Sequence, residues 1–326
     1  MRAIVVASPG GPEQLKLETL PDPSPGAHEV LIEVHATALN RADLLQRRGL
    51  YPAPAGESEI LGLECAGIVR ALGRDVSRFR EGDRVMALLP GGGYAELARV
   101  HENLALSIPE PLSFEQAAAV PEAFLTAYEA LLRTANLAPG ERALIHAGAS
   151  GVGTAAVQIA REVGAYVFST CRGDEKLGKL RELGVERPID STREDFADVI
   201  ARESRGAGVD VIADLIGGAY VEQNQRALGS GGRWVVIGLL GGARATLNLA
   251  DLLMRRQTVA GIVMRSRPLP DKTAIVRGFS NDFLPWFTEG RLQPVLDQTF
   301  ALADAARAHE RMEANLNLGK IVLKVR

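Results

Sequence analysis

Short runs of β-branched and other apolar residues, broken by turn residues, dominate the first 120 or so positions. We expect strands in three of these runs, at 30–34, 67–70 and 84–89. Clusters of Pro, Gly and Ser such as 21–26 separate them, and closely spaced strands with this punctuation are typical of a small β-barrel. One helical patch, residues 41–47, interrupts the pattern. The pattern therefore predicts an all-β unit.

The pattern changes near residue 113. Residues 114–132 carry apolar positions at helical spacing, and strands then alternate with helices. The alternation predicts strands at 143–147, 166–170, 209–214 and 234–237, and helices at 154–163, 175–183 and 221–228. Such alternation implies right-handed crossovers and a parallel, doubly wound sheet. Beyond about residue 266 we expect one more helix, 303–313, and a final strand, 320–325, whose place in a sheet the pattern does not give.

Composition narrows the protein class. A chain of 326 residues with 46% hydrophobic content can fill two cores. Its net charge of −3, from 37 basic and 40 acidic residues, gives no pull toward nucleic acid or an anionic membrane. Two cysteines, Cys65 and Cys171, make no disulfide framework, and no apolar run is long enough to span a bilayer. The first residues look like a strand rather than a signal peptide, so we expect a cytoplasmic protein.

The strongest binding signal is a glycine-rich turn between a predicted strand and a predicted helix. Its residues are Gly148, Ala149, Ser150, Gly151, Val152 and Gly153. A helix that begins there presents backbone N–H groups and a positive dipole end to a pyrophosphate. Ser150 holds the place of the middle glycine of the G-x-G-x-x-G pattern, so its side chain turns away or its hydroxyl joins the binding. A loop that only shapes a bend is the alternative.

The end of the next strand bears on which dinucleotide is bound. An acid about 20 residues beyond the turn commonly holds the ribose hydroxyl of NAD. Asp174 meets that spacing, but it falls where a helix cap or first-turn acid is expected. Arg172 and Lys176 flank Gly173, and two cations beside a small residue suit a 2′-phosphate. We therefore favour NADPH, with plain surface charges as the alternative.

Several separated segments resemble one known family. They are residues 38–43, 62–67, 82–85, 87–93, 120–127, 146–153 and the tail 315–322. They are similar to the medium-chain dehydrogenase/reductases, and within that superfamily to the zeta-crystallin-like quinone oxidoreductases, over essentially the whole chain. The resemblance implies an α/β protein with a GroES-like β-barrel catalytic domain, residues 1–122 and 266–326. It implies a Rossmann dinucleotide-binding domain with a doubly wound parallel sheet over residues 123–265.

Zinc alcohol dehydrogenases of this superfamily provide a contrast. Their catalytic zinc would need thiolates near Asn40 and Glu122 and an imidazole at Leu63, and the residues present do not supply that ligand set. The segment after 82–85 lacks the cysteines of a structural zinc lobe. The five histidines (28, 35, 101, 146 and 309) show no metal-ligand spacing and are expected to be structural or exposed. The sequence predicts a zinc-independent reductase.

Without a metal ion, hydride transfer needs an acceptor that is already electrophilic, such as a quinone or an α,β-unsaturated carbonyl. The resemblance places Tyr51 in a loop over the nicotinamide, where its phenol donates to the developing oxyanion or forms a wall of the site. Packing within its loop is the alternative for Tyr51. Asn40 stands in place of a zinc thiolate, and its amide either donates to a quinone oxygen or is purely structural.

The resemblance implies further cofactor contacts. Thr126 falls where relatives line the nicotinamide pocket, although its hydroxyl could equally bond to the helix backbone. Gly238 and Leu239 follow a predicted strand, where a close approach of the nicotinamide ribose needs glycine, or they form a simple turn. Asn317 and Lys320 match a tail that reaches the cofactor in relatives.

Two further segments concern assembly and cofactor choice. Residues 258–263 form an apolar strand that relatives use for a subunit-spanning sheet, which implies a homodimer. Ser191 replaces a tyrosine that supports the adenosine phosphate in an animal relative, and this departure weighs against strict NADPH preference.

We expect from these features a zinc-independent, NADPH-dependent reductase of small quinones. A double-bond reductase that acts on enones or enoyl thioesters is the alternative enzyme. An NADPH-binding protein with an RNA-binding or structural role is the alternative of another class, and the near-neutral charge without aromatic–basic interleaving disfavours nucleic acid as the main partner.

Overall fold

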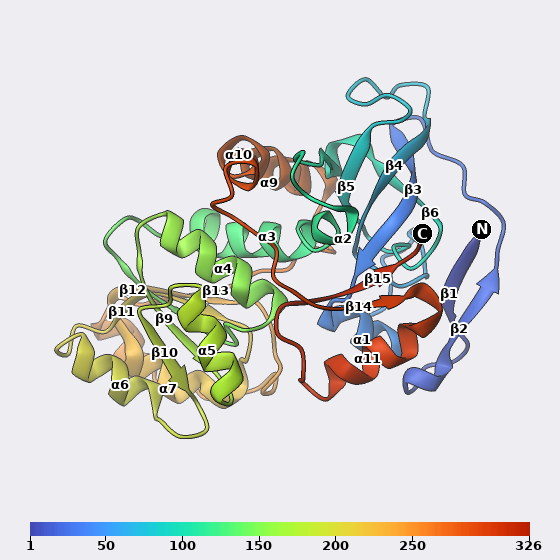
Figure 1. The fold of residues 1–326 in the computed structure, drawn as a ribbon. Coiled ribbons are helices and arrows are strands. Elements are labelled where there is room, and N and C mark those ends of the chain that lie inside the picture. Colours follow the sequence, from blue (N-terminus) through green and yellow to red (C-terminus); the bar gives the residue numbers. More distant parts are fainter. The chain divides into compact units, whose positions relative to one another are not determined.

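The structure is a computed structural model that describes residues 1–326 (Figure 1). The chain forms two compact units. Unit 1 comprises Met1–Leu125 and Met264–Arg326, and unit 2 comprises Thr126–Val263. No helix has the length and apolar character needed to cross a membrane.

Unit 1 is built on a seven-stranded sheet of order β14-β15-β3-β4-β5-β7, with β6 also paired to β3. Every pair is antiparallel except β14 with β15, and β1 and β2 form a separate antiparallel pair. The strands are β1 (Arg2–Val6), β2 (Leu15–Thr19), β3 (Glu29–Ala38), β4 (Glu64–Leu72), β5 (Arg84–Leu88), β6 (Leu97–His101), β7 (Ala105–Ser107), β14 (Leu296–Ala301) and β15 (Lys320–Lys324). The helices are α1 (Arg41–Arg47), α2 (Phe114–Ala117), α9 (Leu269–Asp282), α10 (Leu284–Thr288) and α11 (Ala305–Glu313), and α3 (Pro121–Tyr128) begins in unit 1.

The helix expected at 41–47 is α1, but the prediction for the C-terminal part of unit 1 was wrong. Instead of one helix beyond residue 266, three are present, and α9 is the longest of them. Only Ile275, Val276 and Phe279 of its apolar residues are buried, so its apolar stripe is too sparse to give a clear helical period. The final strand, β15, lies between β14 and β3.

Unit 2 is a six-stranded sheet of order β10-β9-β8-β11-β12-β13, parallel throughout. Its strands are β8 (Arg142–Ile145), β9 (Tyr166–Cys171), β10 (Arg187–Asp190), β11 (Val209–Asp214), β12 (Leu228–Val236) and β13 (Thr258–Gly261). Its helices are α4 (Gly151–Glu162), α5 (Asp174–Glu182), α6 (Phe196–Glu203), α7 (Val221–Ala227) and α8 (Leu249–Met254). α4 and α5 pack against β8, β9 and β10 (Figure 1). The predicted fold class, α/β with a parallel sheet that packs against helices in one unit and a largely antiparallel β unit beside it in the chain, is confirmed by these strand orders.

The core of unit 2 follows from the two-residue period of its strands. Leu144, Phe168, Ile189, Ile212 and Trp234 come from five neighbouring strands and meet the apolar faces of α6 and α7 in one cluster. Residues expected as one helical stretch, 114–132, instead form α2, α3 and a π-helical segment, Glu129–Thr134. Pro121 begins α3, as expected for a residue whose missing N–H is harmless only in the first turn.

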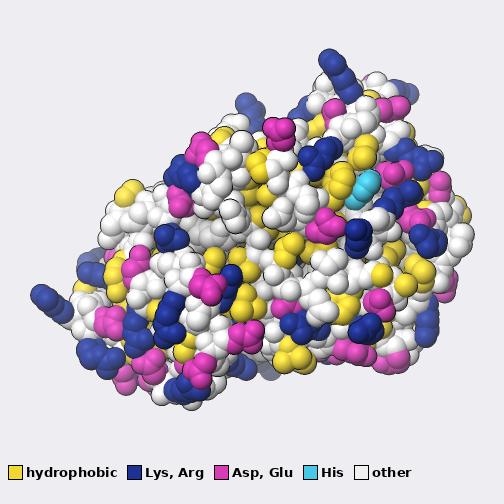
Figure 2. All heavy atoms as spheres, viewed as in Figure 1, with side chains coloured by type: hydrophobic (Ala, Val, Ile, Leu, Met, Phe, Trp, Pro, Cys, Tyr) yellow, Lys and Arg dark blue, Asp and Glu magenta, His cyan; other side chains and the backbone are white.

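On the face seen in Figure 2, basic and acidic side chains are interspersed and neither sign forms a continuous patch. This distribution agrees with the near balance of 37 basic and 40 acidic residues.

Candidate functional site

The glycine-rich turn lies at the point where the order of the parallel strands reverses. From β8 the chain proceeds outward to β9 and β10, and then returns to place β11 on the other side of β8. Loops that follow the two strands at such a switch point diverge and leave a crevice at the carboxyl edge of the sheet. The turn that connects β8 to α4 therefore occupies the position where α/β folds bind nucleotides.

Close packing explains two glycines of this turn. A Cβ atom on Gly148 would lie 1.8 Å from Oγ of Ser169, and one on Gly153 would lie 2.2 Å from the carbonyl oxygen of Ala147. Ala147 itself has a left-handed backbone with φ 48°, which is uncommon for alanine. Such strain is typical of ligand-binding turns, where the surrounding structure holds it in place.

Ser150 is the N-cap of α4. Its hydroxyl oxygen accepts a hydrogen bond from the backbone N–H of Gly153, 3.0 Å away. This contact satisfies one of the free N–H groups of the first turn, and the serine O–H remains able to donate. The side chain thus turns back onto the helix, and the remaining first-turn N–H groups of the 12-residue α4 are available to an anion.

A buried polar network lies directly beneath the turn. Nε2 of His146 lies 2.7 Å from Oδ1 of Asn224, and Nδ2 of Asn224 donates to Asp214 at 3.0 Å. Asp214 also accepts the backbone N–H groups of Ile216 and Gly217 at 2.7 and 2.9 Å. Burial lowers the pKa of His146, so the imidazole is neutral. This histidine is structural, and it links the loop after β8 to the loop after β11.

The cations at the end of β9 lie beside two acids. Arg172 is exposed and forms no ion pair, Gly173 is the N-cap of α5 with φ 85°, and Lys176 is half-buried in the first turns of that helix. Asp174 is a first-turn acid of α5 and pairs with Arg193, with a shortest distance of 2.6 Å. Asp190, at the end of β10, accepts the backbone N–H of Gly173 at 3.3 Å and lies 3.4 Å from Nε of Arg193. Neither Arg193 nor Asp190 was singled out from the sequence.

The turns after β11 and β12 are joined to each other. The N–H of Gly218 donates to the carbonyl of Gly242 at 2.8 Å, and the N–H of Gly238 donates to the carbonyl of Asp214 at 3.2 Å. Leu239, on the same turn, is half-exposed. The hydroxyl of Thr126, in α3, is buried without any hydrogen-bond partner. The helix backbone therefore does not satisfy this hydroxyl, which is the state expected of a group that meets a ligand.

Two of the predicted residues of unit 1, Asn40 and Lys320, belong to a buried polar cluster centred on Glu64. The ammonium of Lys320 donates to Oε1 of Glu64 at 2.6 Å, to Oδ1 of Asn40 at 2.7 Å and to the carbonyl of Leu39 at 2.8 Å. Nδ2 of Asn40 donates to the same Glu64 oxygen at 2.9 Å. All three N–H donors of Lys320 and both ends of the Asn40 amide thus have partners within unit 1. Asn317 is buried, and its amide donates to the carbonyl of Gly319 at 3.0 Å.

Tyr51 lies against Arg265. The guanidinium carbon is 5.3 Å from the centre of the Tyr51 ring, and Nη1 donates to the Tyr51 carbonyl at 3.3 Å. The Tyr51 hydroxyl makes no hydrogen bond. Burial, together with the nearby charge of Glu122, raises the pKa of this phenol.

Sequence reasoning missed the acids of this cluster. Glu64 and Asp43 are fully buried, and Glu122 is half-buried. Burial raises the pKa of Asp43 to about 6, and burial and the charge of Glu64 raise the pKa of Glu122 to about 8. One signal was present in the sequence: Glu64 comes directly before the apolar run 65–69, and a carboxylate beside such a run is buried only when it has partners.

The residues do not fit a catalytic zinc. No group of three or more His, Cys, Asp and Glu side chains is arranged to hold a metal ion. The cation of the Glu64 cluster is the ammonium of Lys320, and Cys65 is a buried free thiol whose pKa is raised by burial. The glycine-rich turn, by contrast, fits a dinucleotide through its helix N-terminus and its closely approached backbone.

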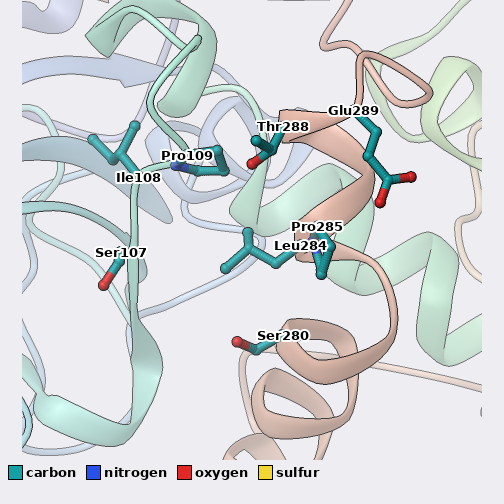
Figure 3. Close-up of a pocket in the computed structure, with 8 residues that line it drawn as sticks. All are labelled: Ser107, Ile108, Pro109, Ser280, Leu284, Pro285, Thr288 and Glu289. Carbon is teal, nitrogen blue, oxygen red and sulfur yellow. The ribbon is translucent and has the colours of Figure 1, made fainter.

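A shallow pocket of about 440 Å³ lies elsewhere in unit 1 (Figure 3). Ile108 and Pro109 follow β7, and Ser280, Leu284 and Thr288 come from α9 and α10. None of the predicted site residues lines it.

Comparisons with known proteins agree with this geometry. Residues 26–110 match the family described as alcohol dehydrogenase GroES-like domain, and residues 151–277 match the family described as zinc-binding dehydrogenase. The chain is 32% identical to quinone oxidoreductase of Rattus norvegicus, over 99% of this chain and 97% of the relative. It is 34% identical to one of the phenolphthiocerol/phthiocerol polyketide synthase proteins of Mycobacterium tuberculosis, over 98% of this chain, but spans only 14% of that relative.

A solved structure adds a third likeness. The chain is 30% identical to CurK enoyl reductase, with a TM-score of 0.89 over 100% of this chain and 99% of that one. The protein belongs to the medium-chain dehydrogenase/reductase family and is an oxidoreductase, and this family uses a nicotinamide cofactor.

Proposed function

We propose that this protein reduces small quinones with NADPH and without zinc. The main support is the full-length similarity to quinone oxidoreductase, together with a unit 1 cluster whose only buried cation beside Glu64 is a lysine ammonium. A quinone needs no Lewis acid, because the charge that arrives with the hydride delocalises onto its oxygen.

The cofactor would be held by unit 2. The free first-turn N–H groups of α4, which begins at Gly151, would bind the pyrophosphate, and Gly148 would allow the close packing that shapes the turn. The 2′-phosphate would meet Arg172 and Lys176, with Arg193 as a further cation near Gly173. Asp174 and Asp190 oppose that preference, so we expect NADPH to be favoured by a limited factor rather than used strictly. When bound, a reduced nicotinamide supplies a hydride.

Reduction of enoyl thioesters or enones is the second candidate. It is favoured by the similarity to a polyketide synthase and to CurK enoyl reductase. Enones and quinones share a conjugated carbonyl, so one site can serve both, and a thioester additionally requires room for its carrier.

A homodimer is part of the proposal. β13 is the edge strand of the parallel sheet, and its free side leaves backbone groups unpaired. Leu253 and Met254 of α8 are each 75% exposed, and Val259 and Val263 are also exposed. Exposed apolar side chains on this open edge strand and in the helix that precedes it in the chain suit pairing with β13 of a second copy.

The experiment that tests the proposal measures loss of NADPH or NADH absorbance by the metal-free protein. The panel contains ortho- and para-quinones, enones and enoyl thioesters. Turnover of quinones with NADPH supports the proposal. Turnover of thioesters alone moves the function to the second candidate, and faster turnover with NADH overturns the cofactor assignment. Tight binding of NADPH without turnover of any acceptor supports a non-enzymatic role instead.

A further inference from the structure

Two polar groups of unit 1 have no partner within the protein. The carboxyl group of Glu122 makes no hydrogen bond, although its backbone N–H is held by Oε2 of Glu64 at 2.8 Å. Nη2 of Arg265 is buried without a partner, and the Arg265 side chain is only 6% exposed. Because buried polar atoms are nearly always paired, a buried donor without a partner points to a ligand, and an unpaired carboxyl group of the same unit is a second group that such a ligand can meet.

The two groups act on each other and on Tyr51. Burial raises the pKa of Tyr51, and the charge of Glu122 raises it further. Burial lowers the pKa of Arg265, and the charge of Glu122 opposes that effect. The charge of Arg265 in turn acts to lower the pKa of Glu122. Nε and Nη1 of Arg265 are fixed by the carbonyls of Pro90 and Tyr51, at 2.7 and 3.3 Å. The guanidinium therefore has a defined orientation, with one nitrogen left to donate.

The other acids of the cluster are already occupied. The oxygens of Glu64 accept from Lys320, Asn40 and the backbone of Glu122. Those of Asp43 accept from the backbone N–H groups of Asn40 and Gly62 and from the Tyr94 hydroxyl. Glu122 is thus the one acid of the three whose carboxyl group is both partly accessible and unpaired.

The surroundings of Glu122 favour its protonated form. Burial and the charges of Glu64 and Asp43 raise its pKa, whereas Lys320 and Arg265 lower it, and the net result is a pKa of about 8. The charge of Glu122 also acts to raise the pKa values of Tyr51 and Lys272. At neutral pH this side chain therefore holds a proton, as a general acid must. The raised pKa of Tyr51 makes that phenol the poorer donor.

We infer that Glu122 is the general acid of the reaction and that Nη2 of Arg265 holds the carbonyl oxygen of the acceptor; this inference rests on the proposed function. The acceptor gains two electrons with the hydride, and negative charge develops on its carbonyl oxygen. The O–H bond of Glu122 breaks as the O–H bond of the reduced acceptor forms. Water then returns a proton to the Glu122 carboxylate. The site takes conjugated carbonyl compounds, with the carbonyl oxygen toward Arg265 and Glu122.

The test compares the wild-type protein with the E122Q, Y51F and E110Q variants, using NADPH and the best quinone or enone. We expect E122Q to lower kcat about 100-fold at pH 7, within the range for loss of a general acid. The fall of wild-type kcat above about pH 8 should be absent from E122Q. Y51F should retain that fall, and E110Q, which removes an exposed carboxylate of unit 1, should match the wild type. The Kd for NADPH should stay within about twofold in all variants, since no cofactor contact is removed.

A measurement without turnover checks the same group. The native protein holds one more proton on Glu122 than the unfolded chain between about pH 5 and about pH 8, so the urea midpoint of the wild type should fall relative to E122Q across that range and then level off. R265K should raise the KM for the acceptor more than it lowers kcat.

Separate outcomes overturn the two proposals. A wild-type protein that reduces no conjugated acceptor contradicts the proposed function. An active wild type whose pH profile persists in E122Q, or a urea midpoint difference that does not vary with pH, contradicts only the role of Glu122. If the fall of kcat above about pH 8 is absent from Y51F and present in E122Q, Tyr51 is the group that donates the proton.

Discussion

The ammonium of Lys320 lies 2.6 Å from the carboxylate of Glu64, and the two side chains are 4% and 0% exposed. A buried pair of this kind adds little net stability, but removal of one partner leaves an uncompensated charge in the interior. We expect K320M to lower the free energy of unfolding by about 3–5 kcal/mol, measured by urea denaturation.

Two further variants identify the cause. K324M, on the same strand, removes an ammonium that is 56% exposed, and we expect a change below about 1 kcal/mol. E64Q/K320M removes both charges and should recover part of the loss. If K320M and K324M are equally stable, the Glu64 cluster is not buried in solution.

His309 and Tyr94 form a series of hydrogen bonds that runs from Arg47 to Asp43, and each group in the series donates to the next. Nδ1 of His309 is 3.1 Å from Arg47, and Nε2 is 3.2 Å from the Tyr94 hydroxyl. Because a guanidinium only donates, Nδ1 accepts, Nε2–H donates to Tyr94, and Tyr94 donates to Asp43. Burial and the charge of Arg47 lower the pKa of His309 to about 3, so the native imidazole stays neutral.

The pH dependence of stability should reveal this histidine. Between about pH 6.5 and about pH 3 the unfolded chain binds a proton that native His309 does not, so its contribution to stability falls as pH falls, by about 1.4 kcal/mol per pH unit. Asp43, with a native pKa of about 6, acts in the opposite sense, because its contribution to stability rises as pH falls. The unfolding free energy of the wild type alone therefore varies less with pH than His309 would make it vary. The difference in unfolding free energy between the wild type and H309Q should therefore shrink on acidification. The exposed-histidine variant H28Q should show no such trend, and a constant difference for H309Q would contradict a neutral, buried His309.

Two glycines of unit 2 should respond in opposite ways to alanine. G148A forces a Cβ against Ser169 at 1.8 Å, so we expect a loss of about 1–3 kcal/mol and loss of nucleotide binding. Gly178 lies within α5 with open space around its Cβ position, so G178A should stabilise the protein by about 0.5–1 kcal/mol. Thermal unfolding with and without NADPH measures both, and a tolerated G148A would show that the turn adopts another conformation.

Arg172 should distinguish the two nicotinamide cofactors. Its exposed guanidinium has no ion-pair partner, so a 2′-phosphate is the group it can gain. R172A should raise the Kd for NADPH about tenfold, equivalent to about 1.4 kcal/mol, and leave the Kd for NADH nearly unchanged. Fluorescence titration at fixed ionic strength measures both constants. R202A, on the exposed side of α6, serves as the control, and an equal effect of R172A on both cofactors would remove the phosphate assignment.

The open edge at β13 should determine the oligomeric state. A charge at Val259 or at the 75% exposed Leu253 would be buried if two copies pair along this edge. We expect V259D and L253E to have the mass of one chain in sedimentation experiments in which the wild type has twice that mass. L17E, at an exposed leucine of β2, should leave the mass of the wild type unchanged. Dimeric V259D and L253E would place the interface elsewhere.

Most of unit 2 could be predicted because its strands are continuous apolar runs between clear helix starts. The strand expected at 209–214 is β11 without change, and the helix expected at 175–183 differs from α5 by one residue at each end. β10 was missed because Arg187–Asp190 is short and half polar. In the candidate site, Asn40 and Lys320 were identified separately through the resemblance. Their common partner was not, since no local pattern indicates that a carboxylate at position 64 meets a lysine 256 residues later.

The division of the chain has a consequence for biosynthesis. Unit 2 is a single continuous segment, whereas the Glu64 cluster needs a lysine that is translated after all of unit 2. During synthesis the nucleotide-binding part can fold as soon as it leaves the ribosome, because domains generally fold as units. Glu64 has no lysine partner until β15 is synthesised and pairs between β14 and β3, so the sheet of unit 1 stays incomplete until then. Chains cut short before residue 320 would carry an unneutralised interior acid, a defect that chaperones and proteases recognise through the surface it leaves exposed.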